Sequence, residues 1–244
     1  MVNAIIVAGG KGKRMNGMIR KQYLSLAGKP ILCHTLQVFD TCRTIDSIFL
    51  VVPEDDIFYC RQRILPPVKL KKTVHLVSGG NDRQASVYNG LAAIERHANT
   101  TISPGDMVVI HDGVRPFVTP EQIDVCVRNA KTSGACILGI PVFDTLKCAD
   151  ALGYVDKTIQ RDILWLAQTP QVFQYHIIMK AHQKAKQIGY HGTDDASLVE
   201  QIGQKVKILE GNRYNIKITN REDLDISEAI LKTGKNVYHP LDKS

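Results

Sequence analysis

Near its start the chain reads Ala4-Ile5-Ile6-Val7-Ala8-Gly9-Gly10-Lys11-Gly12-Lys13-Arg14, an apolar run that leads directly into glycines and cations. The run has the length and β-branched content of a buried strand. Ligands of open α/β sheets bind at the carboxyl ends of strands, which is where these glycines lie. Because backbone N–H groups of a glycine-rich turn can approach phosphate closely, we expect this stretch to bind phosphate. The alternative interpretation is a tight strand-to-helix connection.

Two familiar nucleotide-binding motifs do not fit this stretch. A Walker A loop requires Ser or Thr after Gly-Lys, whereas Arg14 follows Gly12-Lys13 here. A dinucleotide fingerprint requires a third glycine where Met15 stands, and a ribose-binding acid about 20 residues later. The first acid in the chain is Asp40. The sequence therefore predicts a phosphate loop of neither type.

Short apolar runs alternate with amphipathic segments along most of the chain. Buried strands are predicted at 4–8, 48–52, 73–77, 107–110 and 136–140. Between them, apolar residues at i, i+4 and i+7 predict helices, namely Leu32/Leu36/Phe39, Val87/Leu91/Ile94 and Ile123/Val127/Ala130. Pro30 and Pro120 suit the first turns of two of these helices. The alternation predicts an α/β fold with a mainly parallel sheet and helices on both faces.

The alternation of predicted strands and helices stops after Pro141. Residues 142–163 carry no long apolar periodicity, but 145–148 and 154–159 resemble two exposed strands, which predicts a protruding β-arm. An ordinary surface hairpin is the alternative, although an isolated two-stranded arm is marginally stable and is better explained by a partner. Helices are then predicted near 174–187, 195–202 and 221–232, and strands near 205–210 and 215–219. We expect residues 1–244 to form a single domain.

The charge of the chain is concentrated near its start. The formal net charge is +7, yet residues 1–39 hold six basic side chains and no acid. That leaves 25 of the 31 basic side chains against all 24 acids in the rest of the chain. A local excess favours a compact anionic ligand over a long polyanion. Because only 6% of residues are aromatic, a nucleic-acid-binding protein is the less favoured alternative.

The sequence also predicts a cytoplasmic protein. Its apolar runs are far shorter than the roughly 18 residues that cross a bilayer, and its start lacks the basic region of a secretory signal. The six cysteines are scattered without a CxxC pair, so we expect reduced packing residues rather than a zinc site or a disulfide framework.

Three further segments hold candidate site residues. Asp112 follows the apolar run 107–110, where a carboxylate beside phosphates can hold Mg²⁺, although an Asp there is more often a turn former or helix cap. Its neighbour His111 is more often a packing residue than a base. Thr193 precedes two acids and favours a helix start. Lys217, predicted to lie in a strand, is either solvated or faces a cleft with Asp112, where it would neutralise phosphate charge.

Together these segments closely resemble the 2-C-methyl-D-erythritol 4-phosphate cytidylyltransferase family over nearly the whole chain. The matching blocks are 8–15, Lys21-Gln22-Tyr23-Leu24, Gly79-Gly80 with Arg83 and Ser86-Val87-x-Asn89-Gly90, His111-Asp112-x-x-Arg115-Pro116, Pro141-Val142-x-Asp144-Thr145, 165–173, 193–200 and 215–224. The resemblance implies a Rossmann-like nucleotidyltransferase fold and a homodimer joined through the β-arm. It also implies Mg²⁺-dependent transfer of CMP from CTP to a sugar-alcohol phosphate, with release of pyrophosphate.

The resemblance further implies roles for individual residues. Arg14 and Lys21 would contact the triphosphate, and Lys217 would reach the α-phosphate. The expected nucleotide-binding residues are Ala8, Gly9, Gly10, Gly12, Gly80, Asn81, Ser86, Asp112 and Gly113, with Asp112 also a metal ligand. The expected acceptor-binding residues are Arg115, Thr145, Arg161, Thr169 and Thr193. Of these, Arg115 and Thr145 would come from the neighbouring subunit.

Three positions depart from the family pattern. Arg20 stands where Pro is common, Asn81 where Asp often follows the two glycines, and Gly113-Val114 where Ala-Ala is frequent. Ribitol-5-phosphate cytidylyltransferases share nearly every block, so ribitol 5-phosphate is the alternative acceptor, and Lys21-Gln22-Tyr23 favours methylerythritol phosphate. A non-catalytic nucleotide sensor on the same fold is a third possibility.

Overall fold

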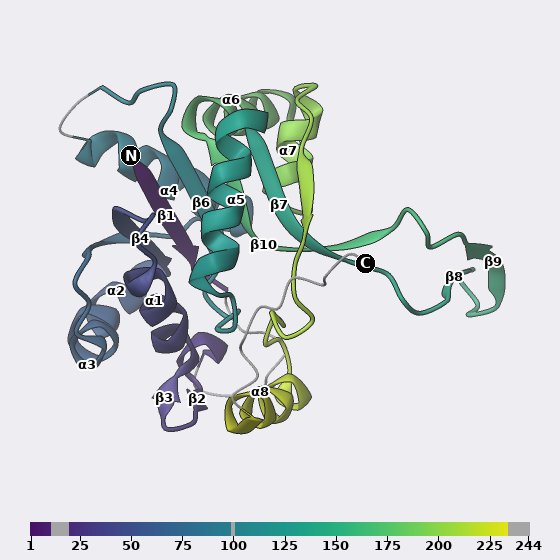
Figure 1. The fold of residues 1–244 in the computed structure, drawn as a ribbon, viewed down its shortest axis with the longest axis horizontal. Helices are drawn as coiled ribbons and strands as arrows, with labels where there is room; N and C mark the ends of the chain where they lie inside the picture. The colour runs from purple at the N-terminus through teal and green to yellow at the C-terminus, as the bar shows by residue number, and fades with distance from the viewer. Residues whose placement is uncertain (11–19, 99–100, 234–244) are drawn as a thin grey trace.

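A computed structural model of the protein describes residues 1–10, 20–98 and 101–233. Its centre is a seven-stranded sheet in the order β11-β7-β10-β6-β1-β4-β5 (Figure 1). The strands are β1 (Val2–Val7), β4 (Ser47–Val52), β5 (Thr73–Ser78), β6 (Met107–Asp112), β7 (Ala135–Pro141), β10 (Trp165–Gln174) and β11 (Lys207–Glu210). Only β10 runs antiparallel to its neighbours, β6 and β7, in this described sheet. The predicted mainly parallel α/β fold is confirmed.

Helices cover both faces of the sheet because alternate strand residues point to opposite sides. Ala4 and Ile6 of β1 pack with α1 (Ile31–Thr41) and α5 (Pro120–Ser133) on one face. Ile5 packs on the other face with α4 (Arg83–His97), α6 (Tyr175–Ile188) and α7 (Asp195–Gln201). Every apolar residue quoted above for the three predicted helices is buried, so those helices and their inward faces are confirmed.

Smaller elements border the sheet. After β1 come the 3-10 turn η1 (Lys21–Tyr23) and the short pair β2 (Ser25–Leu26) and β3 (Lys29–Pro30), and α1 starts directly after Pro30. After β4 the chain forms η2 (Glu54–Asp56), α2 (Ile57–Tyr59), the π-helical turn η3 (Cys60–Ile64) and α3 (Leu65–Val68). The last described helix is α8 (Arg221–Thr233), which packs near β2.

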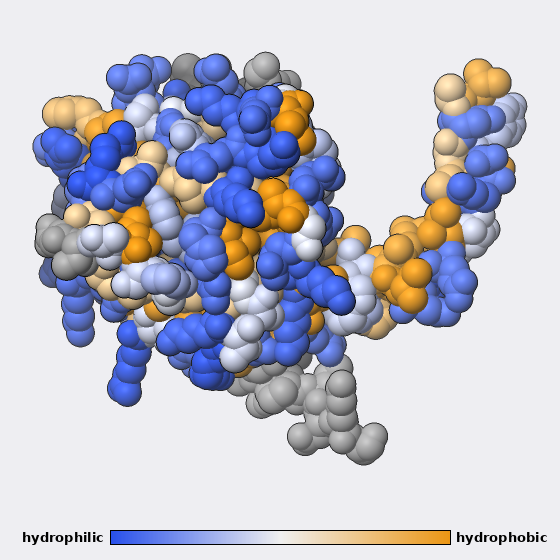
Figure 2. Space-filling model, turned by 90° about the horizontal axis from the view of Figure 1, so that it is seen from above, coloured by the Kyte–Doolittle hydropathy of each residue, from blue (hydrophilic) through white to orange (hydrophobic). Residues whose placement is uncertain are grey.

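The predicted arm is present. Residues 142–164 leave the body between β7 and β10 and carry the pair β8 (Leu146–Ala149) and β9 (Val155–Ile159). Figures 1 and 2 show the arm projecting well clear of the sheet and its helices. Its apolar side chains are open to solvent, with Leu152 83% and Tyr154 71% exposed.

One predicted strand is absent, and one strand of the sheet has no counterpart among the predictions. Residues 215–219 form no strand; Ile216 and Ile218 instead pack into a small apolar cluster with Leu26, Val114 and others, and one backbone bond ties Ile218 to Val114. The alternating pattern is satisfied by that cluster rather than by a strand ladder. Conversely, β10 is a strand that the sequence pattern does not predict, because it holds Pro170 and three glutamines and lacks a long apolar run.

Two further observations concern the cysteines and the length of the apolar helices. None of the six cysteines forms a disulfide, and five of them are buried. No described helix combines the length and the apolar character needed to span a bilayer.

Candidate active site

The candidate active site lies where β1 and β6 end side by side. Gly9 and Gly10 follow β1, and Asp112 is the last residue of β6. The two ends are joined because the amide of Gly113 donates to the carbonyl of Val7 over 2.8 Å. A Cβ built on Gly113 would lie 3.0 Å from Cδ1 of Leu32, so a side chain there would meet a packed helix. The predicted meeting of the glycine turn and Asp112 at one sheet edge is therefore observed.

Three cationic side chains surround the carboxylate of Asp112. Its Oδ2 lies 2.7 Å from Nζ of Lys217 and 3.9 Å from Nε of Arg115, while its Oδ1 lies 3.1 Å from Nε of Arg83. Burial alone would raise the pKa of Asp112, but the charges of Arg83 and Lys217 outweigh burial and hold that pKa well below its usual range. Asp112 is thus a permanent anion that concentrates positive charge at this edge.

Lys217 faces Asp112, as one of its two predicted alternatives requires. The segment that carries it is held by the buried Ile218 on one side and by Asn215 on the other. Asn215 is fully buried; its side-chain amide donates to the carbonyl of Thr169, and its own carbonyl accepts from Nη1 of Arg115 over 2.7 Å. The segment is irregular yet anchored, so the ammonium group of Lys217 is placed without a strand.

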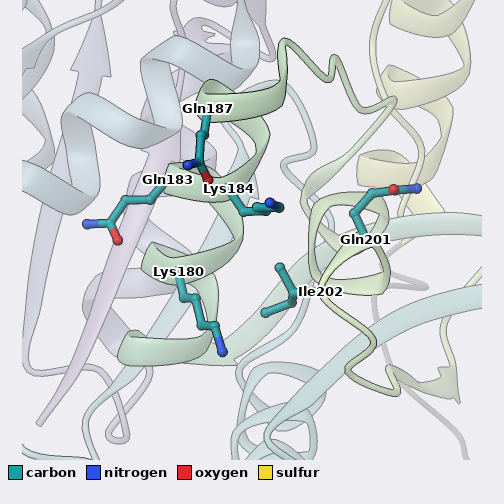
Figure 3. A pocket seen from close by; sticks show the side chains of 6 residues that line it. All are labelled: Lys180, Gln183, Lys184, Gln187, Gln201 and Ile202. Atoms are coloured by element: carbon teal, nitrogen blue, oxygen red, sulfur yellow. The ribbon is translucent and has the colours of Figure 1, made fainter.

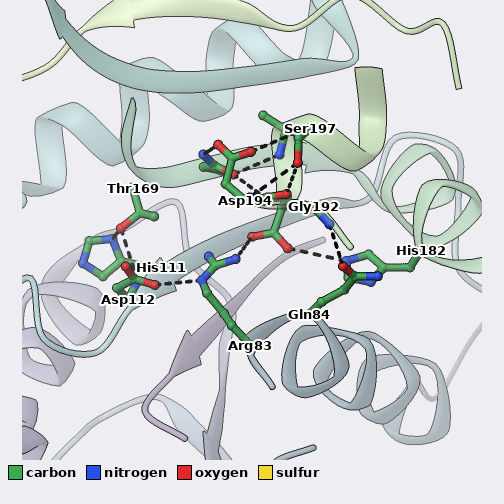
Figure 4. Close-up of polar contacts among 12 residues, drawn as sticks. Arg83, Gln84, His111, Asp112, Thr169, His182, Gly192, Asp194 and Ser197 are labelled. Carbon is green, nitrogen blue, oxygen red and sulfur yellow. Dashed lines mark hydrogen bonds and ion pairs between the residues drawn. The ribbon is translucent and has the colours of Figure 1, made fainter. Parts of the chain in front are cut away.

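His111 and Thr169 form the buried support beneath Asp112 (Figure 4). The carbonyl of Arg115 can only accept, so the Nε2 of His111 carries the proton in their 3.0 Å contact. The hydroxyl of Thr169 lies 3.0 Å from Nδ1 of His111 and accepts from the amide of Asp112 over 3.2 Å. Burial lowers the pKa of His111 to about 4, so the ring is neutral at pH 7. The expectation that His111 is a packing residue rather than a base fits this position.

Arg83, which contacts Asp112 in Figure 4, also pairs with a second buried carboxylate, that of Asp195. Its Nη1 lies 2.7 Å from Oδ2 of Asp195, whose Oδ1 lies 3.5 Å from Nε2 of His182. Arg83 begins α4 and Asp195 begins α7, so the link joins two helix starts on the same face of the sheet. Asp194, not Thr193, is the N-cap of α7 and forms a capping box with Ser197. The predicted helix start is correct to within one residue.

Lys21 lies beside the glycine turn. It is the first residue of η1, and a Cβ built on Gly10 would lie 3.9 Å from its Cε. The buried Gln22 fixes the turn to β1 by donating to the carbonyl of Ala8 over 2.7 Å. On the other side, the hydroxyl of Tyr23 lies 2.9 Å from a carboxylate oxygen of Asp56.

Arg20 does not disturb this turn. Its backbone has φ −67° and ψ 142°, the conformation that proline itself favours. The arginine therefore keeps the backbone geometry of the residue that the family commonly has there. Its side chain adds an ion pair, with Nε 3.2 Å from the carboxylate of Asp56.

The predicted nucleotide pocket is partly assembled around Ser86. The hydroxyl of the buried Ser86 accepts from the amide of Gly80 over 3.0 Å, and a Cβ built on Gly9 would lie 3.3 Å from it. A Cβ on Gly80 would lie 2.4 Å from the Cβ of Ala85, so only glycine allows this close approach. Asn81 is exposed at the rim of the same turn. Gly9, Gly80 and Ser86 thus converge, as the resemblance implies.

Several predicted residues are not brought to this site in one chain. Thr145 and Arg161 are exposed on the arm, where Arg161 donates to the carbonyl of Phe143. Thr193 is exposed just before α7. Arg115 lies beside Asp112 of its own chain, and its nearly buried guanidinium is held by Asp112 and Asn215. That it serves a neighbouring subunit's site stays a prediction. Gly12 and Arg14 lie outside the described residues.

Sequence reasoning assigned no role to Arg83 or Asp195. Arg83 appeared only within a family block, and Asp195 was interpreted as a helix-start acid. The two are 112 residues apart, so no local pattern could pair them. One signal was available, because two successive acids before an apolar helix exceed the single acid that an N-cap requires.

A separate hollow lies on the surface between α6 and α7 (Figure 3). Its lining consists of Lys180, Gln183, Lys184, Gln187, Gln201 and Ile202. No predicted site residue is among these six. The candidate site at the sheet edge is therefore separate from this hollow.

Comparison with known proteins gives a consistent result. The sequence model of a family described as 2-C-methyl-D-erythritol 4-phosphate cytidylyltransferase matches residues 2–233. A protein of that name from Geotalea uraniireducens is 45% identical, with 95% of this chain and 97% of that protein aligned. One from Pelotomaculum thermopropionicum is 44% identical, over 95% and 94%.

Solved structures agree with these sequence matches. The crystal structure of 4-diphosphocytidyl-2C-methyl-D-erythritol synthase from Anaerococcus prevotii superposes with a TM-score of 0.78 at 32% identity, covering 95% of this chain and 96% of that one. The crystal structure of 2-C-methyl-D-erythritol 4-phosphate cytidylyltransferase from Thermus thermophilus gives a TM-score of 0.75 at 30% identity, over 95% and 100%.

Proposed function

The chain belongs to the 2-C-methyl-D-erythritol 4-phosphate cytidylyltransferase family, and from this membership we propose how its residues transfer CMP from CTP to the acceptor. The protein is a nucleotidyltransferase, and methylerythritol phosphate is its acceptor. Ribitol 5-phosphate is not favoured, since the matching family and the relatives named above carry the methylerythritol name. Binding of nucleic acid forms no part of the proposal.

The cations around Asp112 are the observation that carries the mechanism. An oxygen of the acceptor phosphate attacks the α-phosphorus of CTP, and the bond to the leaving pyrophosphate breaks. This oxygen is already anionic, so the reaction needs no strong base. The barrier comes from two anions that repel each other, and fixed positive charge lowers it. Lys217, on a flexible stem and 38% exposed, supplies that charge at the α-phosphate.

Lys21, at the glycine turn, supplies charge to the triphosphate. Its side chain runs past Gly10, since a Cβ built on Gly10 would lie 3.9 Å from its Cε, and backbone N–H groups of such a turn can contact phosphate. Because Gln22 and Tyr23 anchor the turn on both sides, the lysine keeps its place when the ligand arrives. The cytidine occupies the turn formed by Gly80, Asn81 and Ser86, and Arg14 completes the phosphate contacts. Gly12 and Arg14 enter the proposal on the resemblance alone.

A magnesium ion held by Asp112 does not fit the described residues. Both oxygens of Asp112 already contact cations of the chain, at 3.1 Å and 2.7 Å. Among the residues that the structure describes, no group of three or more His, Cys, Asp or Glu side chains could hold a metal ion. We therefore derive no step through magnesium. Mg²⁺ characteristically takes few protein ligands together with substrate phosphates, so the Mg²⁺ requirement that the resemblance implies would rest with the triphosphate.

The arm supports the proposal of a homodimer. It exposes Tyr154 and Val155 on an isolated two-stranded element, which a second copy of the chain would cover. Its Thr145 and Arg161 would then reach the acceptor in the partner's site. We also place the protein in the cytoplasm, where its unpaired thiols would remain reduced.

An acceptor panel tests the function. Purified protein is incubated with CTP and Mg²⁺ plus methylerythritol phosphate, ribitol 5-phosphate or no acceptor, and pyrophosphate release is measured. We expect release with methylerythritol phosphate only. Turnover confined to ribitol 5-phosphate would reverse the choice of acceptor, and CTP binding without turnover on either would favour a nucleotide sensor.

Mixing two inactive variants tests the shared site. If Arg161 acts in the partner's site, Lys217→Ala and Arg161→Ala chains should recover activity in mixed dimers, because one of the two sites then has both residues. Random mixing predicts roughly a quarter of wild-type activity. The control is mixing Lys217→Ala with Lys21→Ala, which should give no recovery because both lysines act in their own chain. No recovery with Arg161→Ala in verified mixed dimers would contradict the shared site.

A further inference from the structure

We propose that Asp195 is a positioning residue that sets the ammonium group of Lys217 through Arg83 and Asp112. The proposal deepens the function above and rests on the role of Lys217 given there. The four side chains alternate in charge and touch in sequence, with N···O separations of 2.7 Å, 3.1 Å and 2.7 Å from Asp195 to Lys217. They come from α7, α4, β6 and the segment before α8, so the series joins four separate parts of the fold.

Arg83 is held too firmly to serve as a mobile substrate ligand. Its guanidinium is shared by two buried carboxylates, with Nε directed to Asp112 and Nη1 directed to Asp195 (Figure 4). The side chain of Asp195 is 1% exposed and that of Asp112 is 9% exposed. A guanidinium can donate along several fixed directions, so one arginine satisfies both anions. Arg83 therefore fixes the orientation of the Asp112 carboxylate.

Lys217 is held less firmly than Arg83. Its Nζ lies 2.7 Å from Oδ2 of Asp112, and its side chain is 38% exposed, the most open of the three cations. When it moves to a substrate phosphate, Asp112 keeps Arg83 and the more distant Arg115 as partners. Release of Lys217 is therefore easier than it would be from a carboxylate with no other cation. Asp112, which Arg83 keeps in position, thus holds Lys217 near the substrate without binding it tightly.

Asp195 completes the arrangement because it keeps Arg83 in place. Its backbone amide donates to Oε1 of Gln171 over 3.1 Å, and the side-chain amide of Gln171 donates to Asp194 over 2.7 Å. The start of α7 is thereby tied to β10. The remaining carboxylate oxygen of Asp195, its Oδ1, faces His182, and both atoms are buried without a hydrogen bond among the described residues. Among the described residues, the ion partners of Asp195 are Arg83 and His182.

The test combines kinetics with a spectroscopic readout of Lys217. In Asp195→Asn we expect kcat to fall roughly 10- to 100-fold, with the KM for CTP changed less than about 3-fold. In protein labelled with ¹⁵N-lysine, the Lys217 ammonium resonance, assigned by its loss in Lys217→Arg, should shift or broaden. Glu200→Gln is the control. It removes an exposed acid from the same helix, α7, and among the described residues Glu200 is not an ion partner of Arg83, so both readouts should stay near wild type.

A double variant separates an effect of Asp195 that acts through Lys217 from a general disturbance of the active site. Single-turnover assays at high enzyme concentration keep the residual rate of Lys217→Ala measurable. Adding Asp195→Asn to Lys217→Ala should lower that rate less than about 3-fold further, because the positioned group is already gone. A further loss as large as in the wild-type background would overturn the proposal. So would wild-type kcat with an unchanged Lys217 resonance in Asp195→Asn.

A second variant, Arg83→Lys, keeps the proposal testable if Asp195→Asn does not fold. Arg83→Lys keeps the charge, but one ammonium group replaces the fork between the two carboxylates, so we expect the same direction of change in kcat and in the Lys217 resonance. Thermal unfolding of each variant reports whether it is folded. If Lys217→Ala itself is fully active, the proposed role of Lys217 fails, whereas a shifted resonance in Arg83→Lys or Asp195→Asn would still support the positioning series. Unchanged kcat and resonance in a folded Arg83→Lys overturn it.

Discussion

Replacing Lys217 by alanine is expected to lower kcat roughly 100- to 1,000-fold, the loss typical when one fixed group that stabilises transition-state charge is removed. Lys217 is the most exposed cation on Asp112 and lies 2.7 Å from its carboxylate. Asp112 keeps Arg83 and Arg115, so the free energy of unfolding should change by no more than about 1 kcal/mol, as for a partly exposed ion pair. Steady-state pyrophosphate release and thermal unfolding measure the two effects.

Lys207→Ala is the matched control for this prediction. Lys207 is also a lysine with one side-chain partner, Asn129 at 2.8 Å, but it lies on the edge strand β11. Its removal should leave kcat within about 2-fold of wild type. A Lys217→Ala enzyme with wild-type kcat would contradict the role assigned to that ammonium group.

Lys21→Ala is expected to lower kcat by a similar factor, roughly 100- to 1,000-fold, and to weaken CTP binding as well. The reason is that Lys21 lies at the glycine turn and would contact the triphosphate both before and during transfer. Its anchors, Gln22 and Tyr23, remain, so the turn should keep its structure. Calorimetric titration with CTP, together with kcat, separates the two effects.

The control for Lys21 is Lys29→Ala, which removes an exposed lysine from the same basic stretch, on β3. Its kcat and CTP affinity should stay near wild type. Equal losses in both variants would mean that the overall charge of the stretch matters rather than the position of Lys21. Full activity of Lys21→Ala would remove it from the mechanism.

The parallel strands and their covering helices were predictable because each leaves a local pattern. The apolar run 107–110 and the spacing of Leu32, Leu36 and Phe39 follow from burial on a sheet or on one helix face. The segment 215–219 has the alternation of a strand, but its apolar side chains are buried by a cluster of distant residues. Strand β10 gains its place from pairing with β6 and β7, which no local pattern records.

In the candidate site, too, some residues follow from a local sequence pattern and others depend on contacts between distant residues. Gly9, Gly10 and Asp112 could be predicted, since each follows an apolar strand and the strand ends meet at one edge. Lys217 was identified as a candidate although its predicted strand is absent. Arg83 and Asp195 could not be assigned, because their roles depend on contacts between residues 29 and 112 positions apart. For Arg115, a sequence does not show which chain's site it completes.

A crystal structure with bound CTP tests the central claim most directly, namely that fixed cations at the ends of β1 and β6 bring two anions together. We predict that the triphosphate lies against Gly9 and Gly10, and that the ammonium groups of Lys21 and Lys217 are within about 3.5 Å of phosphate oxygens. Lys217 should then have moved from Asp112 toward the α-phosphate while Arg83 keeps its contacts. A nucleotide bound elsewhere, or phosphates that neither lysine contacts, would contradict the claim.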